Sequence, residues 1–481
     1  MPQDESCDLV VVGGGPAGYV GAIRAAQLGM KVVCVERDKL GGICLNWGCI
    51  PTKTLLAGAE FYQKVRHDAA SWGIEVDNVR HNWQKVIERS RGVAGNLNKG
   101  IHGLFKKNKV SHLEGLARIV RGGPQCAVEL RDASGSVTRT LESRNLLVCT
   151  GAVPRPLPGA AFDGERIISF KEAMVLPQQP KTLLVVGAGA IGMEFAYFFN
   201  AYGTKVTVIE MLDRVLPNED SDVCTAVARA FKKQGVTCLT ATKTSSIEVK
   251  PGGVQLTTAP ADDPTKSQIM EAEKLLVAIG VKGNFDGLFD PGVGIRIERD
   301  HIVVDRADYG TGVEGIYAVG DVIGAPWLAH VASEEAIVCV EKIAGHEPTA
   351  IDYDAIPGCT YCLPQVASLG KTEDALKASG LQPGTDYKVG KFPFRASGKA
   401  QALGSTDGFI KILSDAAHGE IIGVHMVGES VTELLAEIGL ARRLEASSDE
   451  IIATMHAHPT LSEAVHEAAL GTEGRMIHFT N

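Results

Sequence analysis

The sequence predicts an α/β protein that contains two doubly wound domains. Its 481 residues are too many for one ordinary hydrophobic core, so two to four domains are expected. Hydrophobic residues make up 45% of the chain and charged residues 22%, which is typical of globular proteins. The same order of strand, glycine turn, helix and strand occurs twice, at residues 9–36 and 183–210. This order is typical of parallel sheets covered by helices.

The first copy begins with an apolar run at residues 9–12, followed by a GxGxxG turn and a helix expected at residues 19–28. In such a turn the first glycine permits the tight bend, the second lets the backbone approach a pyrophosphate, and the third lets helix and strand pack closely. The phosphate then lies on free amides at the helix amino terminus, and an acid after the second strand binds ribose hydroxyls. The predicted contacts are Gly13, Gly15, Pro16, Ala17, Gly18, Glu36 and Arg37.

The second copy repeats this design, with a helix expected at residues 193–202. From Gly13 to Glu36 and from Gly187 to Glu210 the offset is the same 23 residues. Glycines used merely for turns would not explain an acid at the same offset twice, so two dinucleotides are expected. The predicted contacts of the second site are Gly187, Gly189, Ile191, Gly192, Glu210 and Gly280.

The second acid favours NAD over NADP. A carboxylate at Glu210, followed by Met211 and Leu212, would repel the 2′-phosphate of NADP. Arg214 lies close enough in sequence to keep NADP open as an alternative.

Two cysteines, Cys44 and Cys49, follow the first nucleotide pattern with four residues between them. At the first turns of a helix, such a pair can bring its sulfurs to bonding distance, and the helix amino terminus lowers the pKa of a released thiolate. A zinc site would need two further ligands, which the neighbouring residues do not supply. Two inert buried thiols remain the other alternative.

The run GGICLNWGCIPTK around these cysteines resembles the redox centre of the pyridine nucleotide-disulfide oxidoreductases, class I. The resemblance continues at GIYAVGD, residues 315–321, which is similar to the family's second FAD segment. It implies a redox-active Cys44–Cys49 disulfide, FAD at the first nucleotide site and NAD at the second. Further FAD contacts implied by the resemblance are Gly42, Ile43, Cys44, Lys53, Ala117, Thr150, Gly151, Asp321, Leu328, Ala329 and His330.

Two more pairs of residues acquire roles from the resemblance. Lys53 is similar to the family's lysine beside the flavin, and Glu194 is similar to the carboxylate that pairs with that lysine. Such a pairing is physically sensible, because a buried charge needs a partner of opposite sign. His458 and Glu463, in the run HPTLSE, resemble the family's acid-base histidine and the glutamate that orients it. A dithiol needs such a base to become a nucleophile. His456 is the local rival. The resemblance implies that the histidine serves the disulfide of the other subunit, so that a homodimer shares its active sites.

Several features point to one branch of the family. Both redox cysteines are present, and the chain ends GRMIHFTN without a second cysteine pair. Residues 356–373, 392–399 and 423–437 look like the branch that oxidises protein-borne dihydrolipoamide to lipoamide with NAD⁺, in 2-oxo acid dehydrogenase or glycine-cleavage complexes. A reductase of glutathione or a similar disulfide that uses NADPH is the alternative enzyme, and a scaffold subunit is the alternative outside catalysis. Two departures from the family are Trp47, where valine is commoner, and residues 281–284, which lack the usual arginine.

The expected organisation is four regions. Residues 1–150 would bind FAD, 151–280 would bind NAD, 281–348 would complete the FAD site, and 349–481 would form an α+β dimerisation domain. The net charge of −9 and the dispersed basic residues predict neither nucleic acid nor an anionic membrane as partner. The amino terminus shows no leader pattern, and no apolar run reaches about 18 residues. We therefore expect a cytoplasmic protein whose 11 cysteines are mostly reduced, and no bound metal.

Overall fold

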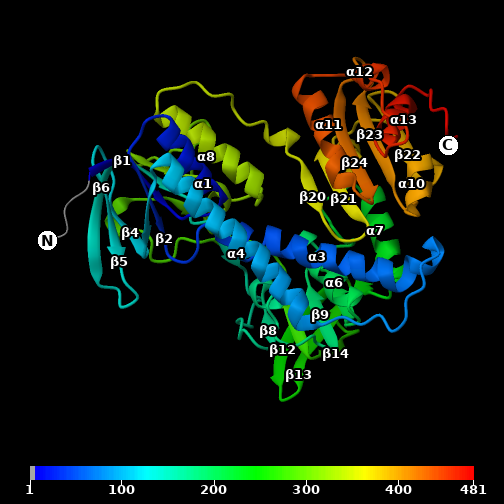
Figure 1. The fold of residues 1–481 in the computed structure, drawn as a ribbon, viewed down its shortest axis with the longest axis horizontal. Coiled ribbons are helices and arrows are strands. Elements are labelled where there is room, and N and C mark those ends of the chain that lie inside the picture. Colours follow the sequence, from blue (N-terminus) through cyan, green and yellow to red (C-terminus); the bar gives the residue numbers. More distant parts are fainter. Residues whose placement is uncertain (1–5, 481) are drawn as a thin grey trace. The chain divides into compact units, whose positions relative to one another are not determined.

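A computed structural model describes residues 6–480 of the chain (Figure 1). Residues 1–5, on which part of the targeting expectation rests, lie outside the described residues. The chain divides into two compact units, each of which is built from three segments. Unit 1 contains the residues up to Leu55, Asn82–Arg155 and Gly280–Ile351, and unit 2 contains Leu56–His81, Pro156–Ile279 and the residues from Asp352 onward.

The main sheet of unit 1 has the strand order β3-β2-β1-β6-β5-β4, with β19 also paired to β6. Strands β3, β2, β1, β6 and β19 run parallel, whereas β6, β5 and β4 form an antiparallel meander. The bounds are β1 Ser6–Val12, β2 Val32–Glu36, β3 Ser111–Glu114, β4 Leu116–Arg121, β5 Cys126–Arg131, β6 Val137–Val148 and β19 Ile316–Ala318.

Helices α1 (Pro16–Gln27) and α8 (Ala329–Ile343) lie side by side against this sheet (Figure 1). The remaining helices of unit 1 are α2 (Gly42–Asn46), the first part of α3 (Cys49–Gln63), and α4 (Trp83–Asn108). Two short antiparallel pairs complete the unit: β7 (Ala152–Pro154) with β16 (Val281–Gly283), and β17 (Ile297–Glu298) with β18 (His301–Ile302). Single 3-10 turns are Pro291–Val293 and Gly320–Ile323.

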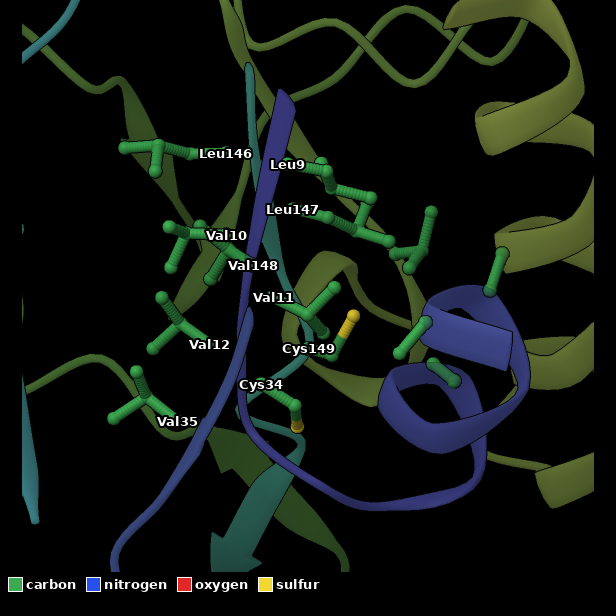
Figure 2. Packing of buried hydrophobic residues seen from close by; sticks show 14 of the residues in the cluster. Leu9, Val10, Val11, Val12, Cys34, Val35, Leu146, Leu147, Val148 and Cys149 are labelled. Carbon is green, nitrogen blue, oxygen red and sulfur yellow. The ribbon is translucent and has the colours of Figure 1, made fainter. Parts of the chain in front are cut away.

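Strand β1 is buried on both faces, which explains its unbroken apolar sequence. Leu9 and Val11 point toward α1, while Val10 and Val12 point to the opposite face (Figure 2). All four side chains are at most 3% exposed. A parallel strand that is covered on both sides reads as a continuous hydrophobic run rather than as an alternating one.

Unit 2 contains a five-stranded parallel sheet in the order β11-β10-β9-β15-β8. A three-stranded antiparallel sheet, β12-β13-β14, joins it. The bounds are β8 Ile167–Ile168, β9 Thr182–Val186, β10 Lys205–Ile209, β11 Thr237–Leu239, β12 Thr242–Lys250, β13 Gly253–Pro260, β14 Gln268–Ala272 and β15 Lys274–Val277. The helices of this part are α5 Phe170–Ala173, α6 Ala190–Ala201 and α7 Ser221–Lys233, and the segment that follows α3 forms turns at Lys64–Asp68 and Ala69–Trp72.

The carboxyl-terminal part of unit 2 is a five-stranded antiparallel sheet with helices, in the order β20-β21-β24-β23-β22. Its strands are β20 Gly358–Thr360, β21 Gln365–Gly370, β22 Tyr387–Pro393, β23 Phe409–Asp415 and β24 Ile421–Gly428. Its helices are α9 Glu373–Ala378, α10 Gly398–Leu403, α11 Val431–Arg443, α12 Ser448–Ala453 and α13 Glu463–Thr472, with short turns at Tyr353–Ala355 and Phe394–Ala396. The fold class expected from the sequence, α/β with two doubly wound sheets and a carboxyl-terminal α+β part, is confirmed.

The predicted helix starts were wrong by three residues at both nucleotide patterns. Helix α1 begins at Pro16 instead of residue 19, and α6 begins at Ala190 instead of residue 193. In both cases the helix starts inside the glycine motif, so that the third glycine lies on the helix. Proline at the first helical position is favourable because its missing N–H would have had no partner there.

The two glycine turns repeat the same close backbone contacts. Gly13 and Gly187 both have φ of 103°. A Cβ on Gly18 would lie 1.8 Å from the Gly13 carbonyl oxygen, and a Cβ on Gly192 would lie 1.9 Å from that of Gly187. No side chain fits at these distances, so the glycines allow each helix to begin against the end of its strand.

A buried ionic cluster ties α7 and α9 to strand β23. Lys411 is 1% exposed, and its ammonium lies 3.0 Å from Asp220, 3.0 Å from Asp222 and 2.6 Å from Glu373. These three carboxylates outweigh burial and raise the pKa of Lys411. Because each charge in the cluster has partners, the ammonium is tolerated inside the unit.

Gly18→Ala tests the close helix-strand contact. The added methyl would overlap the Gly13 carbonyl, so we expect a loss of about 1–3 kcal/mol in the free energy of unfolding. Gly92→Ala is the matched control, because Gly92 lies on α4 and a Cβ there meets nothing within 4 Å. This second change should stabilise the helix by about 0.5–1 kcal/mol. Urea denaturation followed by circular dichroism measures both, and equal midpoints for the two variants would contradict the packing argument.

Lys411→Met tests the buried cluster. It would leave three carboxylates without their central cation, at an expected cost of about 3–5 kcal/mol in the free energy of unfolding. Burial raises the pKa of Asp222 and Glu373, but their lysine partners outweigh it, so both values lie below the ordinary 3.8 and 4.5. Their contribution is therefore present above about pH 4.5 and is lost as the pH falls through the lowered values.

The difference in stability between wild type and Lys411→Met should consequently shrink on acidification below pH 4. Lys233→Met is the control, since its 3.4 Å ion pair with Asp407 is 79% exposed on both sides. Such a surface pair contributes about 0–1 kcal/mol. Denaturation midpoints between pH 3 and pH 8 measure these effects. A pH-independent difference would show that the ion pairs do not stabilise the fold.

Candidate active site

The acid of the first nucleotide pattern closes the glycine turn through its two carboxylate oxygens. Glu36 Oε2 accepts a hydrogen bond from the Gly14 N–H at 2.6 Å, and Oε1 accepts one from the Asp38 N–H at 2.9 Å. Gly15 is the N-cap of α1, and no side chain of the described residues caps this helix. The first-turn amides of α1 are therefore available to an anion such as a phosphate.

The second pattern reproduces this arrangement at Glu210. Its Oε2 accepts a hydrogen bond from the Ala188 N–H at 2.7 Å, and its Oε1 accepts one from the Leu212 N–H at 2.9 Å. Gly189 occupies the N-cap of α6, again without a side-chain cap. The repeated spacing in the sequence thus corresponds to a repeated geometry, with an acid in the same position in both units.

Arg214, the residue that kept NADP open, is already engaged by carboxylates. Its Nε lies 3.0 Å from Asp213, and its Nη1 lies 3.4 Å from Asp374. The ion pair with Asp213 raises the pKa of Arg214. A 2′-phosphate would have to compete with these carboxylates, so the geometry favours NAD.

The two cysteines lie on two helices rather than on the first turns of one, which corrects the expectation from the sequence. Cys44 is in α2, and Cys49 is the first residue of α3. The helices are separated at Trp47 and Gly48, where a Cβ on Gly48 would lie 2.9 Å from the Ile43 side chain. The close turn places Cys44 and Cys49 near each other in spite of the break.

Both cysteines are thiols in this structure, and their side chains are hydrogen-bonded to each other. This hydrogen bond, together with burial, raises the pKa of Cys44 far above its ordinary value, although Lys53 opposes the shift. The Cys44 thiol therefore keeps its proton at neutral pH. The hydrogen bond places the two thiols next to each other, as a pair that forms a disulfide on oxidation requires.

The predicted flavin contacts of unit 1 lie at the ends of its strands and at the starts of its helices. Thr150 and Gly151 follow β6, Ala117 lies on β4, Asp321 lies in the turn after β19, and Leu328 is the N-cap of α8. Ala329 and His330 are the first residues of α8, and Ile43 lies on α2. Arg37 directly follows β2, and the Nη2 of Arg37 lies 3.4 Å from Asn284 Oδ1. Gly42 packs against the first turn, since a Cβ on Gly42 would lie 2.7 Å from the Gly15 Cα.

Two polar groups in this set have unusual surroundings. The Thr150 hydroxyl is buried and has no hydrogen-bond partner within residues 6–480. Burial, with a smaller contribution from Glu335, raises the pKa of Asp321 to about 6. Both groups could be satisfied by the polar atoms of a bound molecule.

Sequence reasoning missed the residues that hold these loops. Glu335 on α8 is 2% exposed and accepts hydrogen bonds from the Gly320 N–H at 2.7 Å and from Arg306 at 2.8 Å. Asn284, in the segment that departs from the family, donates to the Thr150 carbonyl at 3.0 Å. No local pattern marks either residue, because each partner is distant in the sequence.

Lys53 and Glu194 are placed in different units. Lys53 is half-buried on α3 in unit 1. Glu194 lies on α6 in unit 2, is 4% exposed, and accepts a hydrogen bond from the Tyr361 N–H at 2.9 Å. Their pairing stays a prediction. Of the second nucleotide site, Gly187, Ile191 and Gly192 lie in unit 2, whereas Gly280 falls at the start of the last segment of unit 1.

His458 and Glu463 form a pair at the start of α13. The His458 Nδ1 lies 2.8 Å from Glu463 Oε1, and the Thr460 N–H donates to Glu463 Oε2 at 2.8 Å. Burial alone would raise the pKa of Glu463, but these two hydrogen bonds outweigh it and lower the pKa. The His458 side chain remains 77% exposed. A carboxylate on Nδ1 fixes the tautomer and leaves Nε2 as the proton acceptor.

His456 is held differently. Its Nε2 lies 2.7 Å from Glu437, and its Nδ1 lies 2.9 Å from the Thr454 carbonyl. Only 7% of its side chain is exposed. Both ring nitrogens are engaged, so the geometry favours His458 over His456 as an accessible base.

Residues 6–480 contain neither a membrane-spanning helix nor a metal-ligand cluster. No helix in this range combines the length and the apolar character needed to cross a membrane. The same part of the chain contains no group of three or more histidine, cysteine, aspartate or glutamate side chains placed to hold a metal ion.

Comparisons with known proteins agree along the whole chain. Relatives named dihydrolipoyl dehydrogenase occur in Zymomonas mobilis and Bacillus subtilis, with 44% and 41% identity over 98% of this chain and 99% of each relative. A mitochondrial protein of the same name from Arabidopsis thaliana is 39% identical over 99% of this chain and 92% of its own. The crystal structure of LpdA from Mycobacterium tuberculosis superposes with a TM-score of 0.88 at 28% identity, covering 96% of this chain and 99% of that one.

Two family models match consecutive parts of the chain. Residues 7–336, which carry both glycine turns and the cysteine pair, match the pyridine nucleotide-disulphide oxidoreductase model. Residues 356–469, which include the antiparallel sheet and His458, match the dimerisation domain of the same family. The chain therefore belongs to the pyridine nucleotide-disulphide oxidoreductases.

Proposed function

We propose that this chain is a dihydrolipoyl dehydrogenase, which oxidises dihydrolipoamide to lipoamide with NAD⁺ as the electron acceptor and FAD as the intermediate carrier. The observation that carries the proposal is the hydrogen-bonded pair of Cys44 and Cys49 in the same unit as the first nucleotide turn. Residue Gly42, two positions before Cys44, packs directly against Gly15 of that turn. The name shared by relatives of matching length supports the same activity.

The residues of unit 1 fit an FAD molecule. The glycine turn leaves the amino terminus of α1 open to a pyrophosphate, and Glu36 lies beside it for ribose hydroxyls. The buried hydroxyl of Thr150 lacks a partner within residues 6–480, and the carboxyl of Asp321 is nearly buried; both would gain one from the cofactor. When bound, FAD supplies the two-electron chemistry that links the dithiol to NAD⁺.

The chain's own chemistry is thiol-disulfide exchange at Cys44. In the oxidised enzyme a thiolate of dihydrolipoamide attacks the Cys44 sulfur, the Cys44–Cys49 bond breaks, and Cys49 leaves as a thiolate. The second thiolate of the substrate then attacks the substrate sulfur that is bonded to Cys44 in the mixed disulfide. Lipoamide forms, Cys44 is released, and the enzyme has gained the two electrons as a dithiol.

Protons require a base, because a thiol with an ordinary or raised pKa is a poor nucleophile at neutral pH. His458 is exposed and oriented by Glu463, so we assign it the role of accepting a proton from dihydrolipoamide. Glu463 holds the ring in the tautomer with a free Nε2 and stabilises the imidazolium that results. Lys53 and Glu194 are proposed to form the charged pair beside the flavin.

The match to a dimerisation domain supports a homodimer. We propose that His458 serves the cysteine pair of the partner subunit, so that each active site is built from two chains. The proposed partners are lipoylated domains of 2-oxo acid dehydrogenase or glycine-cleavage complexes, and the proposed location is the cytoplasm. The four regions expected from the sequence stay a proposal, with FAD at residues 1–150 and 281–348, NAD at 151–280, and dimerisation at 349–481.

Steady-state turnover of the FAD-replete protein tests this function. We expect rapid reduction of NAD⁺ by dihydrolipoamide and little turnover of glutathione disulfide with NADPH, because Glu210 disfavours a 2′-phosphate and Arg214 is paired with carboxylates. Absorbance at 340 nm measures both reactions. Activity on glutathione disulfide alone would retain the redox centre but reject the proposed substrate.

Replacing each histidine in turn tests the assignment of the base. His458→Gln should lower kcat for dihydrolipoamide by about 10²–10⁴-fold, since it removes general base catalysis. His456→Gln is the matched control and should lower kcat by less than about tenfold, because both nitrogens of His456 are engaged in structural hydrogen bonds. FAD content should be unchanged in both variants. A larger loss in His456→Gln would move the role of base to His456.

A further inference from the structure

Trp47 lies between the two redox cysteines and is held from two sides. Its indole Nε1 donates a hydrogen bond to Asp38 Oδ2 at 3.2 Å. The guanidinium of Arg91, on α4, lies over the Trp47 ring with its Cζ 5.2 Å from the ring centroid. This distance is within the range of a cation-π contact. The side chain that interrupts the two helices is therefore anchored at both its polar edge and its face.

Arg91 also contacts the backbone of the redox segment. Its Nη1 donates to the Asn46 carbonyl at 2.6 Å, immediately before Trp47. The Asn46 side chain donates to the Leu40 and Gly42 carbonyls at 2.9 and 3.0 Å. The last turn of α2 is thus tied to α4 by Arg91 and to its own first residues by Asn46.

Asp38 connects Trp47 to the first nucleotide site. Its carboxylate accepts the indole N–H, while its own backbone N–H donates to Glu36 Oε1 at 2.9 Å. Glu36 in turn accepts from the Gly14 N–H of the glycine turn. A continuous series of hydrogen bonds therefore leads from the glycine turn to the residue between the cysteines, entirely within unit 1.

We propose that Trp47 is a positioning residue that holds the Cys44–Cys49 turn in the geometry required for disulfide formation, through Asp38 on one side and Arg91 on the other. The inference rests on the proposed function in one respect, namely that these cysteines are the redox pair. A valine at this position could form neither contact.

The expected effect is on the equilibrium between the cysteine pair and its substrate. In that equilibrium the disulfide and dihydrolipoamide exchange two electrons and two protons to give the dithiol and lipoamide. Holding two sulfurs close raises their effective concentration and so favours the intramolecular disulfide. Loosening the turn should therefore shift the equilibrium toward the dithiol and make the pair easier to reduce.

The test uses the FAD-bound enzyme under anaerobic conditions, in buffers of dihydrolipoamide and lipoamide at fixed ratios. After acid quenching and alkylation, mass spectrometry of the peptide that contains both cysteines gives the fraction of disulfide. Trp47→Val should shift the equilibrium constant toward the dithiol on the order of tenfold, which corresponds to ~30 mV. Trp47→Phe keeps a ring for Arg91 and loses only the N–H, so its shift should be smaller. Trp72→Phe, at a 59% exposed tryptophan of unit 2, should leave the constant unchanged.

A double-mutant cycle separates the proposed contact from general loosening. Asp38→Ala removes the acceptor of the Trp47 N–H without replacing any residue between Cys44 and Cys49, and it should reproduce the shift of Trp47→Phe. The double variant, Asp38→Ala with Trp47→Phe, should shift the equilibrium constant no further than either single variant. Each single change already removes the same hydrogen bond. Equal constants in wild type and all Trp47 variants, or additive shifts in the cycle, would overturn the inference while leaving the proposed function intact. Failure of wild type to form the Cys44–Cys49 disulfide would overturn both.

Discussion

The close approach between the third and first glycines of each nucleotide turn is the contact on which the rest of both units depends. In unit 1 the Gly18 Cα lies so near the Gly13 carbonyl that no Cβ fits, and Gly192 and Gly187 repeat this relation in unit 2. The contact lets the helix begin where the strand ends, with uncapped amides at its amino terminus. The acid of the following strand then reaches the turn and closes it. One backbone constraint, used twice, thus leaves two helix amino termini without a side-chain cap, each with an acid at the same place.

The cysteine pair that we propose as the redox centre follows a segment that packs against the first of these turns. Gly42 packs against Gly15, and α2 carries Cys44 away from that contact toward Cys49. The break between α2 and α3 brings the thiols into a hydrogen bond, which with burial raises the pKa of Cys44. A protonated thiol is a poor nucleophile, so it reacts slowly until a base removes its proton. It also needs a reaction partner, either a disulfide or an electron acceptor. The exposed His458, oriented by Glu463, has the geometry of such a base.

The features that could be predicted from the sequence are those encoded by short spacing. The glycine turns, the acids at Glu36 and Glu210, the cysteine pair and the HPTLSE run are each local patterns, and the parallel sheets follow from them. The exact starts of α1 and α6 and the break at Trp47 were not predictable from the sequence. They depend on close contacts in the folded chain, such as those of Gly18 with Gly13 and of Gly48 with Ile43. The Lys411 cluster and Glu335 were missed for a different reason. Their partners, such as Asp220 and Gly320, come from distant segments that only folding brings together.

The claim that an active site combines the cysteines of one subunit with His458 of the other is tested most directly by mixed dimers. Chains with Cys44→Ser and chains with His458→Gln, carrying different affinity tags, would be co-expressed and the heterodimer purified through both tags. A heterodimer with shared sites keeps one intact site, so its dihydrolipoamide oxidation should be about half that of wild type, while each homodimeric variant is nearly inactive. A heterodimer no more active than the two homodimeric variants would contradict the shared site and place the base within the same chain as its cysteines.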